Sequence, residues 1–128
     1  MKIITNNPSV YTAYHSEWDV EFLEGKSFLE VLVTCRNYTH QGAKILTHPL
    51  TGSVKPNETP FKSIMLSSNK GAVDTESLIM IESAIEVTQK FLNNAEIKSW
   101  PTRILDDFRV IDFQLITSGI ESANKYNY

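Results

Sequence analysis

Fifteen consecutive residues, His48 to Lys62, hold most of the side chains in this chain that could contact a ligand. The segment reads HPLTGSVKPNETPFK and contains three of the five prolines. Each proline fixes its own φ at about −65° and pushes the preceding residue towards an extended conformation. Long loops inside a compact domain are commonly functional. We therefore predict a stiff loop that presents these polar residues to a ligand: His48, Thr51, Ser53, Lys55, Asn57, Thr59 and Lys62.

His48, directly followed by Pro49, has the widest chemical range of these residues. Its ring changes charge near neutral pH, so it suits a general base or a group that binds an anion. The alternative is that the ring hydrogen-bonds to the backbone of its own loop. Thr51 and Ser53 flank a glycine, and their hydroxyl and N–H groups suit a phosphate or a carboxylate. Neither GxxxxGK[ST] nor GxGxxG is present, which excludes a nucleotide P-loop as a motif.

A second polar pair, Asn6 and Asn7, directly follows the first predicted strand. Asn7 suits the N-cap of a helix and Pro8 its first position, so the pair serves either this helix start or a ligand. The N–H groups at a helix N-terminus favour an anionic group. Lys55 or Lys62 is the candidate for the compensating positive charge.

The elements that must position these residues alternate between strand and helix. Strands are predicted at residues 2–5, 20–23, 44–47 and 63–66, and helices begin at Pro8, after Ser27, after Asp74 and near Pro101. This order predicts an α/β fold, a single three-layer-like domain over residues 1–119 with a mostly parallel four-stranded sheet flanked by helices. Residues 120–128 are predicted to form a fraying tail. Ligands of parallel sheets bind beyond the carboxyl ends of the strands, where Asn6, Asn7 and His48 are expected to meet.

Composition narrows the classes of function. A chain of 128 residues with 41% apolar residues fits one domain. The net charge of −3 gives no basic footprint, so no nucleic acid partner is expected. No apolar run approaches the length of a membrane span and no signal peptide is evident, so we expect a cytoplasmic protein without a membrane partner. The three histidines and the single cysteine, Cys35, show no ligand spacing, so neither a metal nor a cofactor is expected.

Several segments resemble the GrdX family of small proteins associated with gene clusters for glycine, sarcosine and betaine reductases. They are TNNP (Thr5 to Pro8), VEFLEG (Val20 to Gly25), His40 with Gly42, and above all LTHPLTGSVKPNETPFKS (Leu46 to Ser63). The resemblance implies an accessory protein of anaerobic amino-acid metabolism, and it supplies no catalytic residues.

Two classes of function follow. The first is a non-catalytic binding or docking module that contacts a reductase component or a small anionic ligand through the proline-rich loop. The alternative is a small enzyme or sensor for a phosphorylated or carboxylated molecule, with His48 as the acid–base group. The enzyme requires a pocket that contains the polar side chains together, whereas the module predicts an exposed apolar patch or an ordered loop. A lone Cys35 cannot run the dithiol cycle of a reductase component, which favours the module.

Overall fold

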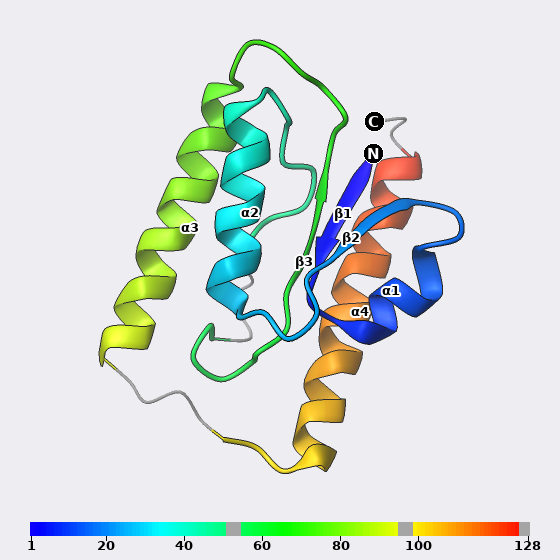
Figure 1. Cartoon of the computed structure of the whole chain (residues 1–128), viewed down its shortest axis with the longest axis vertical. Coiled ribbons are helices and arrows are strands. Elements are labelled where there is room, and N and C mark those ends of the chain that lie inside the picture. The colour runs from blue at the N-terminus through cyan, green and yellow to red at the C-terminus, as the bar shows by residue number, and fades with distance from the viewer. Residues whose placement is uncertain (51–54, 95–98, 126–128) are drawn as a thin grey trace.

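The computed structural model describes the chain at residues 1–50, 55–94 and 99–125. Its strands are β1 (Lys2–Thr5), β2 (Asp19–Phe22) and β3 (Ser63–Leu66), and its helices are α1 (Pro8–Tyr14), α2 (Phe28–His40), α3 (Thr75–Asn94) and α4 (Thr102–Lys125). The sheet lies between α2 and α3 on one side and α1 and α4 on the other (Figure 1). The described elements therefore form three layers, as a helix–sheet–helix sandwich.

The sheet differs from the prediction in size and direction. The described strands form a three-stranded sheet in the order β2-β1-β3, with β1 parallel to β2 and antiparallel to β3. The prediction of four mostly parallel strands is therefore wrong. Parallel pairing holds for β1 and β2, which α1 connects through a crossover. No helix lies between the predicted strand at 44–47 and β3 among the described residues, so the crossover rule does not apply there.

Segment 44–47 pairs with β3 only briefly, through backbone bonds from the Leu46 N–H to the Met65 carbonyl oxygen at 2.9 Å and from the Ser67 N–H to the Lys44 carbonyl oxygen at 2.8 Å. It makes one isolated antiparallel bridge, Ile45 to Leu66. At the two ends of this pairing hydroxyl groups replace backbone carbonyls, because the Met65 N–H donates to Thr47 Oγ1 and the Lys44 N–H donates to Ser67 Oγ. The segment thus runs along the edge of β3 without extending the sheet.

Alternation along the strands divides the core between the two faces of the sheet. Ile3 and Met65 pack with Val10 of α1 and with the α4 residues Ile116 and Ile120. The neighbouring strand residues point the other way and pack against α2 and α3, and this set includes Ile4, Ile64, Leu66, Leu32, Cys35 and Ile81.

Helix ends follow the sequence signals, with one extension. Ser27 and Glu30 form the capping box that begins α2, with Ser27 Oγ accepting from the Glu30 N–H at 3.1 Å. The predicted boundary at residue 119 falls inside α4, which continues to Lys125 with Ile120 and Ala123 buried. Among the helices described, none is long and apolar enough to cross a membrane.

Gly42 provides a test of the turn that follows α2. Its φ is +108°, and a Cβ atom there would lie 2.6 Å from the Gly71 nitrogen. We expect Gly42→Ala to lower the free energy of unfolding by about 3 kcal/mol, because both backbone strain and this collision oppose the side chain. Urea denaturation measures the loss.

Gly71→Ala is the matched control. Gly71 has a φ of +119°, but nothing lies within 4 Å of its added Cβ atom. Strain alone should then cost about 1 kcal/mol. Equal losses in the two variants would show that the collision with Gly71 is relieved at no cost.

Candidate functional site

The Asn6 side chain joins three segments at the end of β1. Its Nδ2 donates to the carbonyl oxygens of Lys26 and Pro60, both at 2.8 Å. Its Oδ1 accepts from the Lys62 N–H at 2.9 Å. These bonds fill the donors of the amide, so Asn6 fixes the proline-rich segment to the sheet.

Asn7 joins α1 to α4. It is fully buried and caps α1, because its Oδ1 accepts from the Ser9 N–H at 3.1 Å. Its Nδ2 donates to the Arg109 carbonyl oxygen at 2.9 Å and to Asp112 Oδ2 at 3.1 Å. The geometry thus supports the interpretation of Asn7 as a helix start, with an added link to α4.

Asp112 is the centre of a buried polar cluster that comprises Thr5, Asn7, Ser63 and Asp112. Its Oδ1 accepts from the Ser63 N–H at 3.0 Å, and its Oδ2 accepts from Ser63 Oγ at 2.7 Å. Thr5 Oγ1 lies 2.6 Å from Ser63 Oγ and accepts from the Asn7 N–H. Burial raises the pKa of Asp112 above its usual range, while the bonds from Ser63 and Asn7 oppose that change.

Sequence reasoning missed Asp112, although a signal was present. Asp112 stands four residues after Phe108 and four before Ile116, so it interrupts the inward-facing row of α4. A carboxylate in such a row is buried and must be bonded. The structure confirms both features.

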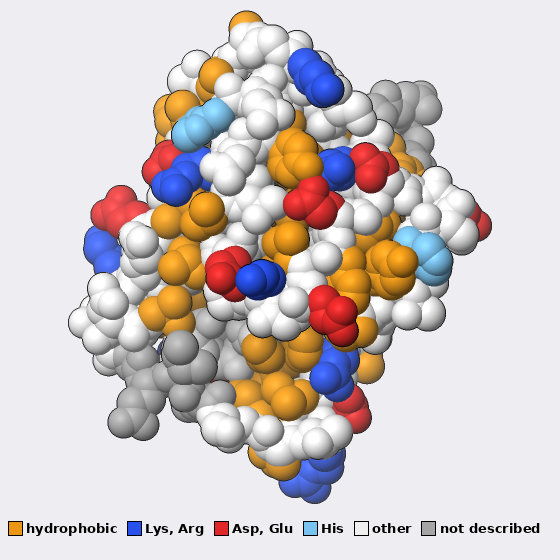
Figure 2. Space-filling view, viewed as in Figure 1, with side chains coloured by type: hydrophobic (Ala, Val, Ile, Leu, Met, Phe, Trp, Pro, Cys, Tyr) orange, Lys and Arg blue, Asp and Glu red, His pale blue; other side chains and the backbone are white. Residues whose placement is uncertain are grey.

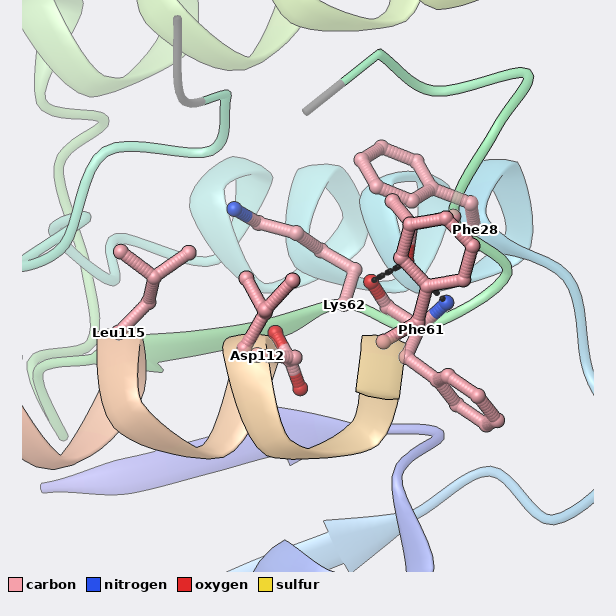
Figure 3. A pocket seen from close by; sticks show the side chains of 8 residues that line it. Phe28, Phe61, Lys62, Asp112 and Leu115 are labelled. Atoms are coloured by element: carbon pink, nitrogen blue, oxygen red, sulfur yellow. Dashed lines mark hydrogen bonds between the residues drawn. The ribbon is translucent and has the colours of Figure 1, made fainter. Parts of the chain in front are cut away.

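Lys62 is buried on the opposite face from Ser63, because successive residues of an extended strand alternate. Only 6% of Lys62 is exposed. Burial lowers the pKa of its ammonium group, and the nearby Asp112 carboxyl group opposes that change. Figure 3 shows the Lys62 side chain directed away from the Asp112 carboxyl group and towards the side on which Leu115 of α4 lies.

Of the remaining predicted residues, His48 bonds to its own loop. It is exposed, and its Nδ1 lies 2.6 Å from the Leu50 carbonyl oxygen and 3.1 Å from the Leu50 nitrogen. The geometry therefore supports the backbone-bonding alternative for His48.

Residues 55–62 are held to α4 and to Trp100, which precedes that helix. Trp100 Nε1 donates to the Glu58 carbonyl oxygen at 2.7 Å, and the Arg109 guanidinium lies 4.9 Å from the centre of the Phe61 ring. Thr59 Oγ1 accepts from the Phe61 N–H at 3.2 Å. Contacts within the loop and with neighbouring residues thus fix residues 55–62 in place.

The last five predicted residues differ in position. Lys55 is exposed, and Thr59 is buried in the local turn just described. Asn57 is buried, and its Oδ1 has no hydrogen-bond partner in the described part of the chain. Thr51 and Ser53 lie outside the described residues.

Two predicted residues, His48 and Lys62, line the same cavity, which we call the Lys62 cavity. It has a volume of about 270 Å³. Its other walls come from the segment beside β3 and from α4: Leu46, Thr47, Ser63, Leu115, Ile116, Gly119, Ser122 and Ala123. Asn6 adjoins Lys62 through the backbone, whereas Asn7 contacts the polar cluster on the other face.

The described side chains do not assemble a nucleophile with a base. Cys35 is buried, and burial raises the pKa of its thiol far above the usual range. Within residues 1–50, 55–94 and 99–125, no group of three His, Cys, Asp or Glu side chains could hold a metal ion.

A separate apolar surface lies between α1 and α4. The α1–α4 groove is open, has a volume of about 590 Å³ and is lined by Pro8, Ser9, Thr12, Ala13, Val110, Phe113 and Gln114. None of these residues is charged, and Val110 is 53% exposed. Elsewhere on α1, Tyr11 is also exposed and stacks on His15 and on Phe22 of β2. Figure 2 shows hydrophobic side chains at the surface over α1, next to a histidine.

Comparison with known proteins gives one match. Neither the curated proteins nor the solved structures contain a match to this chain. The sequence model described as "GrdX-like protein" matches residues 2–121, which is most of the chain. The protein belongs to the GrdX-like protein family.

Proposed function

We propose that this GrdX-like protein is a non-catalytic docking module whose α1–α4 groove binds an amphipathic helix of a protein component of amino-acid reduction. The observation that carries the proposal is an open, uncharged groove with an exposed apolar wall. The centres of protein interfaces are depleted of charged residues in the same way, and helices commonly bind by placing apolar side chains in such grooves.

The bonding of the predicted site residues supports this proposal over the small enzyme. The side-chain amides of Asn6 and Asn7 hydrogen-bond to neighbouring segments, and the His48 ring hydrogen-bonds to the backbone of Leu50. These side chains hold the framework instead of meeting around a substrate. The fixed segment 55–62 also matches the ordered loop expected of a module.

Val110→Asp tests the docking surface. Binding to the purified glycine, sarcosine and betaine reductase components is measured by biolayer interferometry, since the family resemblance implies these partners. We expect the wild-type protein to bind one of them. The new carboxylate should weaken that binding about 30-fold, because a charge in the centre of an apolar interface is desolvated without a partner.

Ile79→Asp is the matched control. Ile79 is 62% exposed on α3, which lies on the other side of the sheet. It should leave the affinity unchanged. Equal weakening by both variants, or no binding of the wild-type protein to any component, would contradict docking through this groove.

A further inference from the structure

Among the described residues, the buried Lys62 ammonium group has no bonding partner. Lys62 is 6% exposed, and its backbone is fixed because its N–H donates to Asn6 Oδ1 while its carbonyl oxygen accepts from the Asn6 N–H. In the described part of the chain, its Nζ makes no hydrogen bond or ion pair. Buried lysines are normally paired, since the ammonium group loses its hydration on burial.

Asp112 does not fill the role of that partner. Its carboxylate oxygens accept from the Ser63 N–H, Ser63 Oγ and Asn7 Nδ2, on the face of the sheet that α4 covers. The Lys62 ammonium group points away from it (Figure 3). Asp112 thus acts on Lys62 only through its charge at a distance.

The Lys62 cavity offers the space for an external partner. Its volume of about 270 Å³ falls just below the usual range of pockets for drug-sized ligands, which begins at roughly 300 Å³. Thr47 and Ser63 line it, although their hydroxyl groups already bond within the protein, while Leu46, Leu115 and Ile116 form an apolar wall. A ligand that fits is small, with one charged end and a short apolar body.

The number of charges selects the class of ligand. Among the described residues that line the cavity, Lys62 is the one lysine or arginine. The Asp112 carboxyl group is close enough to affect the pKa of Lys62. A single positive charge that is partly offset by an acid balances a monoanion better than a dianion. Arginine, which binds phosphate in a bidentate manner, is absent from the described lining.

We propose that the Lys62 cavity is a binding site for a small monocarboxylate, whose carboxylate group pairs with the Lys62 ammonium group while its alkyl part contacts Leu46, Leu115 and Ile116. The site is independent of the α1–α4 groove, because Val110, Phe113 and Gln114 line the groove and a different set of α4 residues lines the cavity.

The test is a titration of the purified protein with sodium acetate, propionate and butyrate, and separately with inorganic phosphate, followed by amide chemical shifts. Sodium chloride at equal ionic strength is the reference. We expect saturable shifts at residues of the cavity with the carboxylates, and affinity that increases from acetate to butyrate as the alkyl part grows. Phosphate should bind more weakly than butyrate.

Lys62→Met should weaken carboxylate binding at least about tenfold, because it removes the charged partner and keeps a side chain of similar length. Lys55→Met, which alters an exposed lysine of the same segment, should leave the affinity unchanged. Equal affinity of the wild-type and Lys62→Met proteins would overturn the assignment of Lys62. Tighter binding of phosphate would overturn the ligand class, and carboxylate shifts no larger than those with chloride would overturn the site.

Discussion

Replacing Asn7 with alanine should lower the free energy of unfolding by about 3 to 5 kcal/mol, as measured by urea denaturation. The change removes the cap of α1, which is usually worth about 1 kcal/mol. It also removes the donor to the Arg109 carbonyl oxygen and one of the donors to the buried Asp112 carboxylate. The larger part of the expected loss in stability comes from the buried Asp112 carboxylate, which loses a hydrogen-bond donor.

The control for Asn7→Ala is Asn69→Ala, which alters an exposed residue in the loop before α3. It should change the stability by less than about 0.5 kcal/mol. If the two variants lose similar amounts of stability, the link between α1 and α4 through Asn7 contributes little.

Asn7→Asp separates the cap from the link to α4. Aspartate keeps an oxygen for the Ser9 N–H, but it places a second carboxyl group beside Asp112. Two adjacent carboxyl groups retain a proton to higher pH. The folded state then binds more protons than the unfolded chain above the ordinary pKa of 3.8. The variant should therefore gain stability relative to the wild-type protein as the pH falls from neutral towards that value.

The parts of the fold that depend on local signals could be predicted from the sequence. The Asn7-Pro8 start of α1 and the Ser27–Glu30 capping box both use bonds between residues close in sequence, and the structure confirms them. The parallel pairing of β1 with β2 follows from the short helix between them.

The extent of the sheet could not be predicted, because it depends on partners distant in sequence. Segment 44–47 has the composition of a strand, but the Met65 N–H donates to Thr47 Oγ1 and the Lys44 N–H donates to Ser67 Oγ. These bonds join residues 18 and 23 positions apart. Nothing in the local sequence shows that a hydroxyl group will take the place of a backbone carbonyl.

The polar residues near the end of β1 could be located, but their roles could not be assigned. The positions of Asn6 and Asn7 after a strand indicated a junction, and the structure shows that this junction is bonded internally. The burial of Lys62 had a signal, because Lys62, Ile64 and Leu66 alternate onto one face of the sheet. The direction of its ammonium group required the positions of α2 and α4.

Replacing Lys62 with methionine should raise the free energy of unfolding by about 1 to 3 kcal/mol at pH 7, because a buried cation without a close partner is replaced by an apolar side chain. The pKa of Asp112 depends on Lys62 less than on the bonds from Ser63 and Asn7, so the polar cluster should remain intact. Urea denaturation of the two proteins measures the difference, and Lys55→Met should match the wild-type protein within about 0.5 kcal/mol.

The difference in unfolding free energy between Lys62→Met and the wild-type protein should depend on pH, because Lys62 titrates differently in the folded and unfolded states. The pKa of Lys62 is lowered in the folded protein from its ordinary value of 10.5. Between the two values the unfolded chain binds more protons, so the stability of the wild-type protein rises with pH there. The Lys62→Met variant lacks this rise in stability. The difference in stability between the two proteins should therefore narrow as the pH approaches 10.5. A variant that is less stable than the wild-type protein at pH 7 would show that the ammonium group stabilises the fold. A stabilising replacement, by contrast, indicates that the chain keeps a buried charge at the expense of stability, as a binding site requires.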